Sequence, residues 1–138
     1  MLGGCDEYKV WANKLNLKNI HFIPHTSSVD EIHNFLSGID VLAHSRNDGE
    51  VCSAIMIGTM YYGKPIISHP ALNLGHLEML AGCGKIANTL DEYTGEMVLL
   101  EHSRNYYENK SNLTLARYYE KYDYNKVEKQ FKELYIII

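Results

Sequence analysis

Short apolar runs alternate with helical patterns along the first two thirds of this chain, and this alternation limits the possible folds more than any other feature. The runs cover residues 20–23, 41–45, 65–68 and 85–88. The second and third carry apolar residues at successive positions, which is typical of strands that are buried on both faces. Such strands, separated by helices, predict an α/β fold with a Rossmann-like parallel sheet and helices on both faces.

Apolar residues at helical spacing predict the helices between these strands and after them. The predicted helices cover residues 6–15, 30–36, 51–62, 75–80, 92–100, 113–122 and 124–138. Gly63 follows the third of them and is expected to end it, because glycine readily adopts the backbone conformation needed there. The chain of 138 residues has the length of one domain. We therefore predict a single domain over residues 1–138, with a helical C-terminal tail from about residue 90, whose many tyrosines serve mainly packing.

Charge and cysteine content exclude several classes of function. The net charge is −4 and the isoelectric point is near 5.9, which argues against a nucleic-acid-binding face and a polybasic membrane anchor. No run approaches the roughly 18 apolar residues of a membrane span. The three cysteines, Cys5, Cys52 and Cys83, form no CxxC pair, so neither a zinc site nor a disulfide framework is expected. We expect a protein of the reducing cytoplasm.

A polar loop follows Ser45, where a predicted strand ends, and leads into a predicted helix that starts at Val51. In open α/β sheets, ligands bind beyond the carboxyl ends of the strands. The amides of Val51, Cys52 and Ser53 would lie in the first helical turn, where they have no partners within the helix. Together with the helix dipole they would form an anion site suited to phosphate, and Arg46 could add a charge-assisted hydrogen bond.

Glu50 and three histidines lie near the same predicted edge, and their roles stay open at this point. Glu50 could accept hydrogen bonds from sugar hydroxyls, or it could merely complement the positive end of the helix. His44 ends a predicted strand, so that it is either part of the site or a packed side chain. His69 and His76 flank a loop at the same edge. His76 and Glu78 are two positions apart, a poor spacing for two ligands on one helix face, so no metal site is expected.

Several stretches match a known family in order and at similar spacing. They cover residues 19–23, 40–45, 49–53, 60–68, 75–78, 82–86 and 122–135. On these residues the chain resembles the C-terminal, donor-binding domain of the retaining GT-B glycosyltransferases of family 4, also called group 1. The resemblance implies transfer of a sugar from a UDP- or GDP-sugar to a hydroxyl acceptor, with no covalently bound cofactor and usually without a metal.

The resemblance also implies roles for individual residues. Glu50 matches the first of two glutamates in the family motif and would act at the donor sugar as the catalytic residue. The implied donor-binding residues are Ser45, Arg46, Gly49, Val51, Cys52, Ser53 and, near the nucleobase, His25.

The chain departs from the family pattern in ways that leave two functions open. The second glutamate, which holds the donor ribose in the family, is replaced by Gly58. The family's phosphate-binding Arg and Lys and its N-terminal acceptor domain would lie upstream of residue 1. The chain is then either a glycosyltransferase domain that needs an N-terminal domain or a partner subunit for activity, or a non-catalytic Rossmann-like binding or assembly module derived from a glycosyltransferase. In the module, the sheet edge and the tyrosine-rich tail would bind a partner or a second copy in a homo-oligomer.

Overall fold

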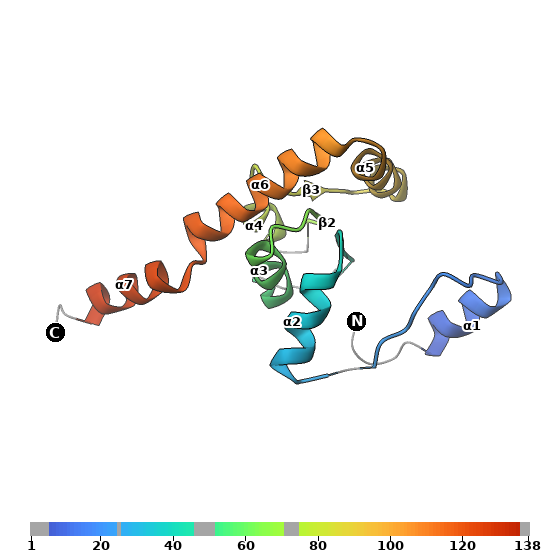
Figure 1. Cartoon of the computed structure of the whole chain (residues 1–138), viewed down its shortest axis with the longest axis horizontal. Helices are drawn as coiled ribbons and strands as arrows, with labels where there is room; N and C mark the ends of the chain where they lie inside the picture. The colour runs from blue at the N-terminus through green and yellow to red at the C-terminus, as the bar shows by residue number, and fades with distance from the viewer. Residues whose placement is uncertain (1–5, 25, 46–51, 71–74, 136–138) are drawn as a thin grey trace. The chain divides into compact units, whose positions relative to one another are not determined.

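A computed structural model describes residues 6–24, 26–45, 52–70 and 75–135 of the chain. The chain divides into two compact units, Met1–Phe35 and Leu36–Ile138, and each unit is described here by itself. The elements follow in the order α1 (Asp6–Lys14), α2 (Val29–Gly38), β1 (Leu42–His44), α3 (Ala54–Tyr61), β2 (Ile66–Ser68), α4 (Gly75–Met79), β3 (Lys85–Ile86), α5 (Leu90–His102), α6 (Arg104–Lys121) and α7 (Tyr124–Tyr135) (Figure 1).

The first unit holds α1 and most of α2. Asn16 adopts a left-handed conformation with φ of 51°, and the amide of Leu17 donates to the carbonyl of Ala12 at 3.0 Å. This arrangement ends α1 as a Schellman motif, in which the left-handed residue lets the chain turn back on the last helical carbonyls. α2 begins after Ser28, whose hydroxyl lies 3.4 Å from the amide of Glu31.

The strand predicted at residues 20–23 is wrong, because these residues form neither helix nor strand. Ile20 and Ile23 are 44% and 56% exposed, so that the apolar run is not buried as a sheet strand would be. A strand exists only where a neighbouring strand supplies hydrogen bonds, and an apolar run in the sequence cannot show whether such a neighbour is in place.

The second unit is built on a parallel sheet with the strand order β1-β2-β3. Leu42 pairs with Ile66, and Ile67 pairs with Lys85. The strands predicted at 41–45, 65–68 and 85–88 are confirmed in place, although each is shorter than expected. All three residues of β2 are buried, whereas β1 lies at the edge of the described sheet and exposes Ala43.

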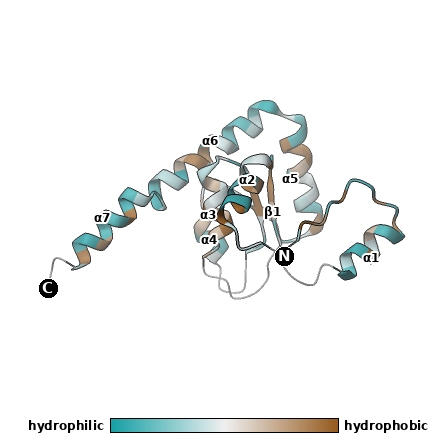
Figure 2. Cartoon of the chain, turned by 60° about the horizontal axis from the view of Figure 1, so that its bottom comes forward, coloured by the Kyte–Doolittle hydropathy of each residue, from teal (hydrophilic) through white to brown (hydrophobic). Residues whose placement is uncertain are grey.

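Helices cover both faces of this sheet, as Figure 2 shows with α3 and α4 on one side and α5 on the other. Successive residues of a strand point to opposite faces. Ile66 therefore packs in one cluster and Ile67 in another. The first cluster contains Met56 and Met60 of α3, Met79 of α4, Leu80 and Cys83. The second contains Ala87 and Leu100, with Val41, Tyr93, Tyr106 and Tyr107 packed against it. The predicted α/β class with a parallel sheet covered on both faces is confirmed.

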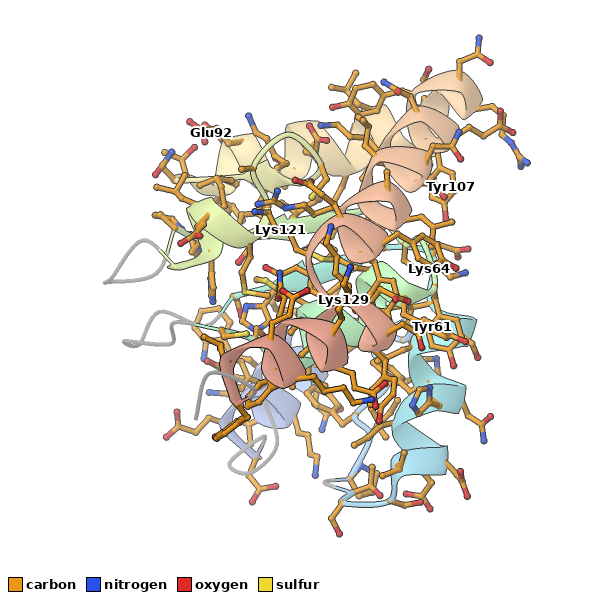
Figure 3. The ribbon with its side chains drawn as sticks, turned by 90° about the vertical axis from the view of Figure 1, so that its left-hand side faces the viewer. Tyr61, Lys64, Glu92, Tyr107, Lys121 and Lys129 are labelled. Carbon is orange, nitrogen blue, oxygen red and sulfur yellow. The ribbon has the colours of Figure 1, made fainter. Side chains whose placement is uncertain are left out.

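The predicted helical C-terminal segment is also confirmed, and its helices differ in how they pack. α5 and α6 contribute tyrosines to the core clusters, which confirms the packing interpretation for those tyrosines. The Tyr107 hydroxyl of α6 (Figure 3) donates to the carbonyl of Asp40 at 3.0 Å. α7 has no buried residue. No helix in the described part of the chain is long and apolar enough to cross a membrane.

Two helical glycines differ in what surrounds them and allow a matched test of this packing. A Cβ added at Gly58 in α3 would stand 2.7 Å from Cδ1 of Leu36, a side chain that is only 2% exposed. A Cβ added at Gly95 in α5 would meet nothing within 4 Å.

We expect Gly95→Ala to stabilise the protein by roughly 0.5–1 kcal/mol, because alanine loses less backbone entropy on helix formation. Gly58→Ala has the same favourable effect on backbone entropy, but its Cβ overpacks the contact with Leu36. We therefore expect the free energy of unfolding to fall by about 1 kcal/mol in this variant. Urea unfolding of the two variants measures this difference. Equal stabilisation by both substitutions would show that Leu36 moves aside freely.

Candidate functional site

The carboxyl ends of the three parallel strands meet at one edge of the sheet, where a cluster of polar side chains gathers. Its members come from β1, β2, the start of α3, α4, α5 and the segment after β2: His44, Ser53, Ser68, His69, His76 and Tyr93. His76 and Ser68 are fully buried and Ser53 is 1% exposed. Buried polar groups are costly unless they are hydrogen-bonded, so this network must be satisfied for the edge to fold.

α3 begins at Ala54, which corrects the predicted start at Val51. Ser53 has an extended backbone, with φ of −101°, and is the N-cap residue, so that Cys52 and Ser53 precede the helix. The Ser53 amide donates to the Met79 sulfur at 3.3 Å, and its hydroxyl oxygen lies 3.4 Å from Nε2 of His44 rather than capping the helix. The helix starts later than the spacing of apolar residues indicated, because these tertiary contacts hold Ser53 buried in an extended conformation.

Hydrogen bonds to backbone carbonyls fix the tautomers of two histidines. Nδ1 of His76 lies 2.9 Å from the carbonyl oxygen of His69, and Nδ1 of His69 lies 2.8 Å from that of Ala87. A carbonyl oxygen only accepts, so that Nδ1 carries the proton in both rings. Ser68 donates to the His69 carbonyl at 3.1 Å and lies 3.0 Å from Nδ1 of His76. The His44 ring meets the His76 ring edge to face, with centroids 5.0 Å apart. His44 and His76 thus belong to one packed network.

Tyr93 joins this network from α5, on the other face of the sheet. Its hydroxyl donates to the carbonyl of His44 at 2.6 Å, across 49 positions of sequence, and its ring lies 5.1 Å from that of His69. Burial raises the pKa of Tyr93 to about 12, although a hydrogen bond to the backbone of His69 lowers it in part. Sequence analysis missed Tyr93, because no local pattern distinguishes it from the other tyrosines of the C-terminal helices.

The structure describes only some of the residues predicted to bind the donor. Ser45 is exposed one residue after β1, Cys52 is exposed, and Ser53 is buried beside His44. The other predicted site residues lie outside the described residues: Arg46, Gly49, Glu50, Val51 and His25. The proposed role of each stays a prediction. No group of His, Cys, Asp and Glu side chains among the residues that the structure describes could hold a metal ion.

The fold is similar to that of Anabaena Alr3699/HepE, for which crystal structures in complex with UDP-glucose and in complex with UDP and glucose are known. Each matches with a TM-score of 0.80 at 17% sequence identity and covers 96% of this chain. The chain spans only 36% of the length of that protein. No protein-family model and no curated protein matches the chain. At this identity the likeness shows a shared fold.

The raised pKa of Tyr93 predicts a loss of stability in alkali. Between pH 10, its ordinary pKa, and pH 12, Tyr93 is ionised in the unfolded chain and protonated in the folded protein. The unfolded state then binds fewer protons, so that the free energy of unfolding is maintained below pH 10 and falls as the pH rises towards 12. Urea unfolding across this range should show a shallower decline for Tyr93→Phe than for the unsubstituted protein. If the free energy of unfolding fell equally steeply with pH in Tyr93→Phe and in the unsubstituted protein, the prediction would be wrong.

Proposed function

We propose that this chain is the donor-binding domain of a retaining, family 4-like GT-B glycosyltransferase. It would bind a UDP- or GDP-sugar at the carboxyl edge of its sheet, for transfer of the sugar to a hydroxyl acceptor. The observation that carries the proposal is the fold likeness over 96% of the chain to a protein crystallised with UDP-glucose. The matching motifs of the sequence, in the same order, support it independently.

The start of α3 supplies the physical basis for binding the diphosphate. The amides of Ala54, Ile55 and Met56 occupy the first turn of the helix, which leaves them without partners inside it. The helix dipole adds a partial positive charge at this end, which favours an anion. In the proposal Arg46 adds a charge-assisted hydrogen bond to the diphosphate, and Glu50 accepts hydrogen bonds from hydroxyls of the donor sugar. Amide donors placed at the leaving diphosphate would stabilise its charge as the glycosidic bond breaks.

The proposed active site needs a second wall. The chain spans 36% of the length of the protein that it resembles in fold. Glycosyl transfer requires that donor and acceptor are held together and that water is kept from the reacting carbon. We propose that a second domain, a partner subunit or another copy of the chain completes the cleft.

The free thiols of Cys52 and Cys83 fit a reducing compartment, and we place the protein in the cytoplasm.

Titration with UDP, UDP-glucose, GDP and GDP-glucose tests the donor site and separates the proposed roles of two residues. Glu50→Gln should weaken UDP-glucose binding roughly tenfold, the value of a lost charge-assisted hydrogen bond, and change UDP binding less than twofold. Arg46→Ala should weaken the binding of both ligands, because the diphosphate is common to them.

Glu101→Gln is the matched control, because it removes one negative charge from an exposed position of α5. It should leave both affinities unchanged. Absence of nucleotide binding below millimolar concentration in the unsubstituted protein would refute the donor-site proposal. Equal losses for UDP and UDP-glucose in Glu50→Gln would refute the assignment of Glu50 to the sugar.

Packing around Gly58 favours a second candidate function, that of a non-catalytic binding or assembly module. Gly58 stands where the family motif has its second glutamate, and Leu36 occupies the space that a side chain would need. A longer side chain at this position would have to displace a buried leucine. This packing fits a domain that has kept its sheet and helices but lost a contact to the donor.

Assays of transfer and hydrolysis with several nucleotide-sugars separate the two functions. Turnover by the protein, alone or with a completing domain, would exclude the non-catalytic module. Nucleotide-sugar binding without turnover under either condition would favour it.

A further inference from the structure

Two tyrosine hydroxyls hold the edge strand β1 at its opposite ends. Tyr93 of α5 donates to the carbonyl of His44, the last residue of β1, at 2.6 Å. Tyr107 of α6 donates to the carbonyl of Asp40, two residues before β1, at 3.0 Å. Among the described strands β1 pairs only with β2, so that these side chains restrain a strand with a single hydrogen-bonded neighbour.

The two ends of β1 differ in what they contact. At the carboxyl end, Nε2 of His44 lies 3.4 Å from the hydroxyl oxygen of Ser53, the N-cap residue of α3. The Ser53 carbonyl accepts the hydrogen bond of the Ile57 amide at 3.1 Å and thereby closes the first turn of the helix. A continuous path of contacts therefore runs from Tyr93 through His44 and Ser53 to the start of α3.

We propose that Tyr93 is a positioning residue for the nucleotide donor, because its hydroxyl fixes His44 and through it the N-terminus of α3. The inference rests on the proposed function, in which the first-turn amides of α3 face the donor diphosphate. An anion site made of backbone amides depends on their direction, so that a small movement of the helix end weakens binding. Tyr107 makes the same type of hydrogen bond at the amino end of β1, where the proposal places no ligand.

The surroundings of Tyr93 suit this role. Its hydroxyl also lies 3.4 Å from the carbonyl oxygen of Ile67, the middle residue of β2, so that it contacts carbonyls of two adjacent strands. With a pKa of about 12, the hydroxyl keeps its proton and stays a donor at neutral pH. Phenylalanine at position 93 would retain the ring beside His69 and remove only the hydroxyl.

Nucleotide titration of Tyr93→Phe and Tyr107→Phe in the full chain tests the proposal. Tyr93→Phe loses the hydrogen bond to the His44 carbonyl and the longer one to the Ile67 carbonyl. Tyr107→Phe loses the hydrogen bond to the Asp40 carbonyl, and both variants should lower the melting temperature. Tyr93→Phe should raise the Kd for UDP roughly three- to tenfold, whereas Tyr107→Phe should change it less than twofold. Equal effects of both variants on the Kd would overturn the positioning role and indicate general destabilisation.

Hydrogen exchange in the absence of nucleotide tests the same path without relying on the proposed function. Amides of the peptide Ala54–Tyr61, including that of Ile57, should exchange faster in Tyr93→Phe and keep their rate in Tyr107→Phe. Unchanged exchange in Tyr93→Phe would overturn the inference. If the unsubstituted protein binds no UDP, the proposed function fails, and the exchange rates still decide whether Tyr93 positions α3.

His44→Ala serves as a second variant should Tyr93→Phe fail to unfold cooperatively. It removes the ring that contacts Ser53 and retains the backbone carbonyl that Tyr93 holds. The Kd for UDP should rise as in Tyr93→Phe. Where all variants fold, the double variant should bind UDP more tightly than two independent effects predict, because both substitutions interrupt one path. If the two substitutions had strictly additive effects on the free energy of UDP binding, or if His44→Ala left the Kd for UDP unchanged, the path through His44 would be refuted.

Discussion

Burial of both faces of β2 is the constraint on which the second unit of the structure depends. Ile66 and Ile67 point to opposite sides of the strand, and both are buried. Helices therefore cover each face separately, with α3 and α4 on one face and α5 on the other, and tyrosines of α6 pack against both core clusters. Because the strands are parallel, the same arrangement brings all three carboxyl ends to one edge, beside the start of α3. The candidate site is thus a consequence of how the core is covered.

Tyrosines of the C-terminal helices serve the core and the backbone at the same time. The rings of Tyr93 and Tyr107 pack against the cluster around Ile67, while their hydroxyls reach carbonyl groups at the two ends of β1. A tyrosine suits this position because most of its surface is apolar and its tip is a hydrogen-bond donor. The same two helices therefore contribute to the core and bond to the backbone at both ends of the edge strand, which links the packing of the core to the geometry of the candidate site.

Local sequence patterns predicted which helices and strands exist better than they predicted the residues at which these elements begin and end. Gly63 ends α3 as expected, with φ of 60° and the amide of Lys64 donating to the carbonyl of Thr59, because a glycine after a helix is a local signal. The start of the same helix was predicted three residues too early, since Ser53 is held by His44 and by the Met79 sulfur. The strand expected at residues 20–23 is absent, because it depended on a neighbour that local sequence does not specify. Of the candidate site, the sequence indicated the carboxyl edge and the histidines near it, but not Tyr93.

The sequence by itself determined the α/β class and the alternation of strands and helices from residue 29 to residue 102, and it predicted the sheet edge at which a ligand would bind. These properties follow from the spacing of apolar residues and from turn-forming residues such as Gly63, which act over a few positions of the chain. Only the tertiary structure decided the tautomers of His69 and His76, the burial of Ser53 and the hold of Tyr93 on β1. Those contacts join residues distant in the chain, and their existence depends on how helices and strands pack, for which spacing along the sequence carries no information.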